Sequence, residues 1–328
     1  MGHWMGRRWS VLLLLALLAA PATGNEALEP ELREIERLNF AEHWRESDER
    51  IQALADRLDE LTPTQRQRLE YVRLRNLGIA GRLEEAVEGF AELLREEMPP
   101  SLKVKAFATG SSVAANLEDW TTAFTWLGEA LAYVTEAPDD AARVLGMASY
   151  LHSLVGETGK ARELALRGLA MVEGGDDRRA VCHALSDLAL AEELAENHAE
   201  SGRIRRRQME ACDAAGDRIY AANARYGVGK MLAAQGKTDE ALSWAMQSLA
   251  EFEAAGFEAG AWSARLVLAE CLIASGREFD HAHDLLAGAL RYYRARNSQM
   301  AVAESERKLA ELAERRGDPV QAVRHLKA

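Results

Sequence analysis

Residues 225–252 contain two runs of apolar and small residues at helical spacing, joined by a short polar turn at residues 235–239. The first run carries Tyr226, Met231 and Leu232, and the second carries Ala241, Ala245, Ser248 and Leu249. Residues three and four positions apart share one side of a helix, so the stretch predicts two helices joined by a turn. Small residues in the second helix would let the first approach closely. Such a hairpin cannot bury its own apolar side and therefore needs neighbours.

Copies of this hairpin recur along most of the chain. A small residue after a turn repeats at Ala86, Ala123, Ala161, Ser201, Ala241, Ala282 and Ala322, at intervals of 37, 38, 40, 40, 41 and 40 residues. Four residues later stand Phe90, Leu127, Ala165, Arg205, Ala245, Leu286 and Leu326, which are all apolar except Arg205. The third position of the pattern holds Leu93, Ala130, Gly168, Gln208, Ser248 and Ala289. A regular interval of about 40 residues predicts about seven stacked hairpins.

This pattern resembles the tetratricopeptide repeat (TPR) family, whose units pair two helices around a small residue, a bulky residue four positions later and another small one. The resemblance covers residues 65–328 and is strongest at 67–96, 221–252 and 262–292. It is weakest at 181–212, where polar Arg205 and Gln208 break the pattern. The resemblance implies an all-α, right-handed superhelical solenoid of antiparallel helix pairs, with a concave groove lined by the first helix of each pair.

The composition favours a helical, acidic protein. The chain has a formal charge of −12, 48% of its 328 residues are hydrophobic, and only 7 are proline. An acidic chain lacks the positive field on which general nucleic-acid binding depends, so no nucleic acid is expected as a partner. Cys182, Cys212 and Cys271 are too few, and odd in number, for a disulfide framework. We expect each to be a small buried side chain within a helix.

Residues 1–24 have the pattern of a secretory signal peptide. Arg7 and Arg8 precede an unbroken apolar run from Val11 to Ala20, and small residues follow at the spacing of a cleavage site. Ten helical residues span about 15 Å, half of a bilayer core, which favours export to the periplasm over an uncleaved inner-membrane anchor. Residues 25–64 predict two charged helices that cap the first repeat, with Pro63 in the first turn of the next helix.

The repeats are expected to fill residues 65–328, and the last one to be incomplete. Asp318 and Pro319 would start a final helix that carries Ala322 and Leu326 on its inner face. A helix of about ten residues covers the preceding pair poorly, so we expect the natural chain to continue past Ala328 or to lack a cap.

Three short motifs suggest chemistry but have structural explanations. Residues 174–177, Gly-Gly-Asp-Asp, resemble part of the GG[DE]EF signature, yet no Glu-Phe follows and the flanks are helical, which favours a turn with an N-capping aspartate. His281 and His283 lie two apart, and Cys182 and His183 are adjacent. Neither spacing places two ligands on one helix face, so no metal is expected.

The remaining motifs also argue against chemistry in this chain. The basic cluster at residues 203–207 is interpreted as a solvated, partly paired helix face. Gly227 and Gly229 lie mid-helix with no preceding strand, so they predict close helix packing rather than a phosphate loop. No arrangement of nucleophile, base and oxyanion donors is recognisable, and we expect neither catalysis nor a cofactor.

The register of the repeats predicts which side chains face the groove. They are Arg68, Tyr71, Arg75, Lys105, Thr109, Ser112, Asn116, Arg143, Tyr150, His183, Asp187, Asn223, Tyr226 and Lys230. The expected partner is a protein or peptide, with a small ligand as an alternative. Asn223 with Lys230 resembles one edge of the clamp by which related domains hold a peptide carboxylate.

The layout also resembles the periplasmic TPR sensor region of GGDEF-type diguanylate cyclases, which implies signal transmission through a homodimer. Three hypotheses therefore stay open. The chain is an exported interaction or ligand-sensing module, the sensor portion of a membrane-bound cyclase whose catalytic domain is absent here, or a stand-alone periplasmic scaffold or assembly factor.

Overall fold

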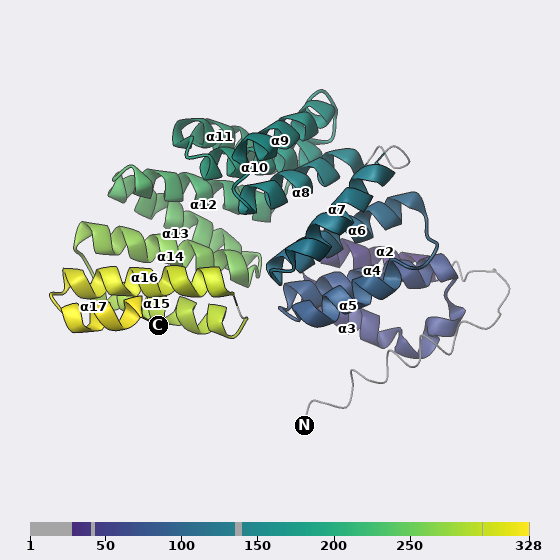
Figure 1. Cartoon of the computed structure of the whole chain (residues 1–328), viewed down its shortest axis with the longest axis horizontal. Coiled ribbons are helices and arrows are strands. Elements are labelled where there is room, and N and C mark those ends of the chain that lie inside the picture. Colours follow the sequence, from purple (N-terminus) through teal and green to yellow (C-terminus); the bar gives the residue numbers. More distant parts are fainter. Residues whose placement is uncertain (1–27, 41–42, 135–139, 297, 328) are drawn as a thin grey trace. The chain divides into compact units, whose positions relative to one another are not determined.

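The structure, a computed structural model, describes residues 28–40, 43–134, 140–296 and 298–327. Every regular element in these ranges is a helix (Figure 1). Within them, no helix combines the length and the apolar character needed to cross a bilayer. The predicted signal peptide lies outside the described residues. Contacts divide the chain into two compact units, residues 1–102 and 103–328, which are treated separately below.

The first unit is built on helix α4, and the N-terminal helices pack against it. Its elements are α2 (Glu29–Phe40), α3 (Trp44–Ala53), the 3-10 helix η2 (Ala55–Glu60), α4 (Pro63–Ile79) and α5 (Leu83–Leu93). Leu32, Ile35 and Ile51 are fully buried in the core. Thr62 and Gln65 cap the start of α4 reciprocally, and Pro63 occupies its first turn as predicted, because its missing N–H costs nothing there.

The second unit consists of helix pairs that follow one another in chain order (Figure 1). Its helices are α6 (Pro100–Asn116, in this unit from Lys103 on), α7 (Trp120–Tyr133), α8 (Ala141–Leu154), α9 (Thr158–Val172), α10 (Arg178–Leu194), α11 (His198–Ala215), α12 (Arg218–Ala234), α13 (Thr238–Ala254), α14 (Glu258–Ser275), α15 (Phe279–Arg294), α16 (Gln299–Arg315) and α17 (Pro319–Leu326). The predicted all-α solenoid of antiparallel helix pairs is confirmed.

The repeated small residues bring the two helices of each pair together. All seven, from Ala86 to Ala322, are buried. In two pairs the helices are also tied at this level, because Ser111 donates to the carbonyl of Ala123 at 2.6 Å and Ser201 to that of Ala189 at 2.9 Å. Close approach of the backbones is therefore what the small residues contribute, as the pattern predicts.

Two positions depart from the pattern. Leu326, expected on an inner face, is 62% exposed, because α17 ends there and no further helix covers it in the described residues. Arg205, assigned to a solvated basic face, is instead buried together with Gln208. The other arginines of that cluster, Arg203, Arg206 and Arg207, are exposed, so the interpretation holds for them and is wrong for Arg205.

The first helices of successive pairs form one wall of the second unit. Helices α8, α10, α12, α14 and α16 contact one another in that order. Between the second helices α9, α11 and α13, the described residues show no comparable contacts. A row of helices that touch on one side and separate on the other curves toward the touching side, so the wall of first helices is the inner one.

Candidate functional site

The predicted groove residues of the first unit are largely engaged in holding that unit together. Arg68 pairs with Glu36 at 2.7 Å and with Glu29 at 2.9 Å, which ties α4 to α2. Tyr71 is buried and packs edge-on against Phe90. Arg75 is half-buried. Arg68 and Tyr71 therefore have a structural role in the described state.

The predicted residues on α6 and α8 lie at the start of the second unit. Ser112 and Thr109 are half-buried, and Asn116 and Arg143 are exposed. Lys105 approaches the carboxylate of Asp140 at 3.9 Å. Tyr150 is half-buried, and burial raises the pKa of its hydroxyl.

A polar cluster lies where α10, α11 and α12 meet. Arg205 extends from α11 and donates from Nη1 to Asn223 Oδ1 at 3.0 Å and to Gln208 Oε1 at 3.1 Å. Its Nη2 donates to Glu193 Oε2 at 3.3 Å. Arg205 is a donor only, so it fixes the orientation of the Asn223 amide, with Oδ1 toward the guanidinium and Nδ2 away from it.

Glu193 joins a second cation to this cluster. Its Oε1 accepts from Lys230 Nζ at 2.7 Å. Burial would raise the pKa of Glu193, but the charges of Lys230 and Arg205 outweigh it and hold the pKa below its ordinary value. Lys230 and Asn223, the two residues proposed as the edge of a carboxylate clamp, are thus both engaged within the protein. A peptide carboxylate would compete with Glu193 for Lys230.

Asp187 on α10 is the acidic group of the cluster that has no ion-pair partner among the described residues. In the described part of the chain no hydrogen-bond donor contacts its carboxylate, although it is partly accessible and densely surrounded. Burial raises its pKa to about 7, against the opposing effect of Arg205. Asn223 likewise keeps its Nδ2 without a partner among the described residues.

Two glycines make room for these charged side chains between helices. A Cβ on Gly146 of α8 would lie 2.0 Å from Asp187 Oδ2, and one on Gly227 of α12 would lie 2.5 Å from Arg205 Nε. That Nε is buried and has no hydrogen-bond partner in the described structure. Gly227 therefore permits close packing, as predicted, but the group that it admits is a guanidinium rather than an apolar helix face.

Of the predicted groove residues, His183 and Asp187 lie on α10, and Asn223, Tyr226 and Lys230 lie on the neighbouring first helix α12. Register alone gave no reason to include Arg205 and Glu193. Arg205 stands on α11, the second helix of its pair, and only its long side chain lets it reach the wall of first helices. The sequence did single out Arg205, because this arginine occupies a position that is apolar in the other repeats, in the stretch where the TPR resemblance is weakest.

A second cluster lies beside the first, at one end of α10. Cys182 of α10 and Cys212 of α11 are buried within helices as expected, but they form a disulfide, with Cα atoms 5.0 Å apart, which the sequence analysis did not expect. Adjacent helices bring together two residues that are 30 positions apart, which sequence spacing could not indicate. Cys271 is free and buried, as expected.

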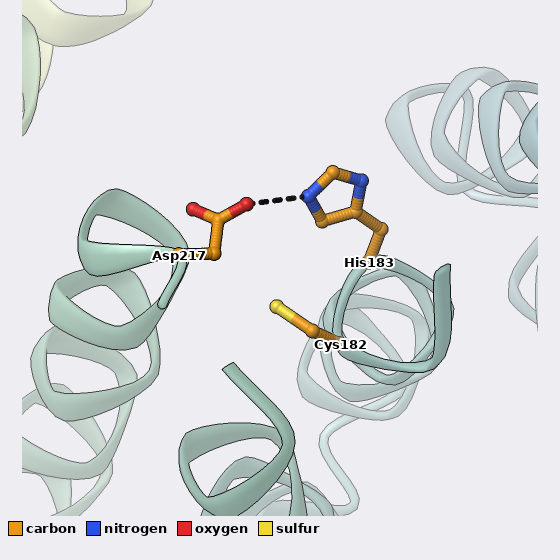
Figure 2. Close-up of side chains that lie close together, drawn as sticks. All are labelled: Cys182, His183 and Asp217. Carbon is orange, nitrogen blue, oxygen red and sulfur yellow. Dashed lines mark hydrogen bonds and ion pairs between the residues drawn. The ribbon is translucent and has the colours of Figure 1, made fainter. Parts of the chain in front are cut away.

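Next to the disulfide, His183 and Asp217 point toward each other (Figure 2). His183 Nε2 lies 3.0 Å from Asp217 Oδ2, and the imidazole stacks on the ring of Tyr220. Asp217 caps α12 by accepting from the Tyr220 N–H, after Gly216 ends α11 in the left-handed conformation, where glycine avoids a Cβ clash. In this state, therefore, Nε2 of His183 is engaged by the carboxylate of Asp217.

Comparisons with solved structures identify the fold. A Rap protein complexed with competence and sporulation factor superimposes with a TM-score of 0.64 at 14% identity, covering 92% of this chain and 96% of that one. NprR in complex with its cognate peptide NprX gives 0.62 at 11% identity, covering 92% and 89%. A signal-transduction ATPase with a tetratricopeptide repeat sensor from Pyrococcus horikoshii gives a TM-score of 0.56 at 13% identity, covering 92% of this chain and 45% of that one.

These likenesses establish that the chain has a TPR-like fold. No protein-family model matches the sequence, and no curated protein matches it.

Proposed function

We propose that the inner wall of the second unit binds a peptide or a peptide segment of a protein partner, and that the chain acts by binding rather than by catalysis. The observation that carries the proposal is the unused hydrogen-bonding capacity of Asn223 and Asp187 on that wall. Nδ2 of Asn223 can donate to a peptide carbonyl, and the Asp187 carboxylate can accept from N–H or ammonium groups. Half-buried Tyr226 lies near Lys230 and Glu193, and half-buried Tyr150 stands on α8, which packs against α10.

Preorganisation supports this assignment. Arg205 holds the Asn223 amide in one orientation, and Glu193 holds both Arg205 and Lys230. A rigid polar site loses less conformational entropy on binding than a mobile one. The similar NprR structure was determined with its cognate peptide, which agrees with this type of ligand.

The test is a selection from a random peptide library displayed on phage, with the immobilised full chain as bait. Enriched peptides are synthesised, and their affinities are measured by fluorescence polarisation. We expect Asn223→Ala and Asp187→Ala to weaken binding about tenfold or more, equivalent to about 1.4 kcal/mol each. Arg206→Ala, on the exposed side of α11, is the matched control and should leave affinity unchanged. Failure to enrich any sequence, or equal binding by all variants, would overturn the proposal.

We also propose that the protein is exported to the periplasm. Two independent features support this: the signal pattern at residues 1–24, and the Cys182–Cys212 disulfide, a bond typical of oxidising compartments. The test fuses residues 1–24 to a leaderless alkaline phosphatase, which is active only after export. Active enzyme in the soluble periplasmic fraction is expected. Active enzyme in the membrane fraction would instead favour an uncleaved anchor, and inactive fusion would contradict export.

A sensor role is the second candidate, favoured by the fold likeness to a structure whose tetratricopeptide repeats are described as a sensor. In that case peptide binding would regulate a catalytic domain encoded beyond Ala328. Sequencing the gene past this codon tests it: a span of about 20 apolar residues followed by a catalytic domain would support the sensor role. A stop codon would leave the interaction or scaffold role.

A further inference from the structure

We infer that Cys182, His183, Cys212 and Asp217 form a zinc site when the disulfide is reduced. In the disulfide state the two sulfurs are bonded to each other and are not available as ligands. The Sγ of Cys182, a ring nitrogen of His183 and a carboxylate oxygen of Asp217 nevertheless all lie within 4.8 Å of one another. Figure 2 shows that the three side chains converge from α10 and from the start of α12.

The distances are close to what zinc requires. Zn–S bonds of about 2.3 Å and Zn–N or Zn–O bonds of about 2.0–2.2 Å give neighbouring ligand atoms of a tetrahedral site separations of about 3.3–3.8 Å. The three atoms therefore need to move by only about 1 Å to surround one ion. Cys212 is the candidate fourth ligand, because its sulfur is bonded to that of Cys182 in the disulfide. After reduction the two sulfurs would have to separate to about 3.8 Å to bind one tetrahedral ion.

The residue types also fit zinc. Two thiolates, an imidazole and a carboxylate are borderline-soft N, S and O donors, which suit Zn²⁺ in a closed four-coordinate site. The adjacency of Cys182 and His183 argued against a site on one helix, but Cys212 and Asp217 come from two other elements. Adjacent residues on α10 point in different directions, and the neighbouring helices close the space between them.

The surroundings would orient the ligands. Stacking on Tyr220, with ring centroids 3.9 Å apart, fixes the plane of the His183 imidazole. Asp217 Oδ1 accepts from the Tyr220 N–H, which leaves Oδ2 facing His183. Arg179 Nε also lies 3.4 Å from Oδ2 and would have to leave; its side chain is 54% exposed, so it can turn into solvent. Zinc would take the place of the hydrogen bond between His183 Nε2 and Asp217 Oδ2.

Conversion between the disulfide and the zinc-bound state is a thiol–disulfide exchange followed by metal binding. A small dithiol reduces the Cys182–Cys212 bond, becomes a cyclic disulfide itself, and transfers two electrons and two protons to the protein sulfurs. Binding of Zn²⁺ to the two resulting thiols then releases both protons. The same two cysteines thus link α10 to α11 covalently under oxidising conditions and through a metal ion under reducing conditions.

The experiment uses the full chain and Zn²⁺ alone as the probe. The protein is reduced with a dithiol, desalted without oxygen, and titrated with Zn²⁺ against a chromophoric chelator, beside the oxidised form. We expect the reduced form to bind one Zn²⁺ about 100-fold or more tightly than the oxidised form. His183→Gln and Asp217→Asn should each weaken zinc binding about tenfold or more, while Cys271→Ala, which removes the third thiol, should leave it unchanged.

Two results would overturn the inference. One is a reduced protein that keeps its helical circular dichroism but binds zinc no better than the oxidised form. The other is zinc binding that depends on the cysteines and is indifferent to His183→Gln and Asp217→Asn. If reduction itself lowers the helical signal, stoichiometric Zn²⁺ should restore it, and failure to restore it also contradicts the site.

Discussion

Arg205 on α11 donates a hydrogen bond to Glu193 on α10, with Nη2 and Oε2 3.3 Å apart, at a position where every other repeat has an apolar side chain. Arg205 is buried and Glu193 half-buried. The pair explains why the repeat that contains α10 and α11 departs from the pattern. The apolar residue that would pack between its two helices is replaced by an arginine, which holds Glu193 and Asn223 on the inner wall.

The first prediction concerns this pair. Arg205→Ala removes a buried cation and leaves Glu193 and Asn223 with fewer partners, so we expect it to lower the free energy of unfolding by roughly 2–4 kcal/mol. Arg205→Met keeps most of the volume and should cost less. Urea denaturation measures both. Arg206→Ala, exposed one residue further along, should stay within about 0.5 kcal/mol of the parent protein, and a similar value for Arg205→Ala would refute the structural role.

The second prediction concerns the disulfide. Cys182 and Cys212 are separated by 30 residues, and closing a loop of that size in the unfolded chain is worth roughly 3–4 kcal/mol. Replacing both cysteines with alanine should therefore reduce the free energy of unfolding by about that amount. Equilibrium denaturation measured without added metal checks this. Dithiol treatment should destabilise the parent protein similarly and leave the double variant unaffected; equal sensitivity of the two proteins would argue against the bond.

The third prediction is a pH dependence that arises from Asp187. Its ordinary pKa of 3.8 rises to about 7 in the folded protein, so the folded state binds the proton more tightly than the unfolded chain does. Stability contributed by this group is therefore complete below pH 3.8 and is lost as the pH rises through 7. Arg205 from α11 opposes this shift, and Tyr150, Tyr226 and Lys230 are further titratable groups on the adjacent helices α8 and α12.

Asp187→Asn removes that titration. The variant should be more stable than the parent at pH 8 by roughly 1–3 kcal/mol, and the difference should disappear near pH 4. Urea midpoints at pH 4, 6 and 8 give the comparison directly. A difference that is constant across this range would mean that the Asp187 carboxyl does not titrate in it.

The fourth prediction tests the fit between Gly146 and Asp187. A Cβ at residue 146 would lie 2.0 Å from Asp187 Oδ2, so Gly146→Ala must displace that carboxylate. We expect weaker binding of selected peptides and no net stabilisation, although alanine in a helix is favoured over glycine by up to about 1 kcal/mol. Adding Asp187→Ala should remove the steric penalty, which a double-mutant cycle detects as coupling.

Gly128 on α7 is the matched control, since nothing lies within 4 Å of a Cβ placed there. Gly128→Ala should stabilise the protein by about 0.5–1 kcal/mol through helix propensity alone. If Gly146→Ala gave the same gain and left peptide affinity unchanged, the packing of Asp187 against α8 would be wrong.

The sequence by itself determined the architecture. Small residues at a regular interval must face a neighbouring helix, because a larger side chain there would hold the pair apart, and the buried series from Ala86 to Ala322 follows this rule. The turns also follow from local chemistry: Asp177 and Asp217 cap α10 and α12 because a short acidic side chain can accept from the free N–H groups of a first turn.

The tertiary structure alone decided which polar side chains meet. Repeat register assigns a residue to a face but not to a partner. It could not show that Arg205 reaches from α11 to Asn223, nor that Asp187 has no partner in the part of the chain that the structure describes. It also could not pair Cys182 with Cys212 or place Asp217 beside His183. These contacts join residues 18–34 positions apart on different helices, and their distances depend on how those helices pack rather than on any local spacing.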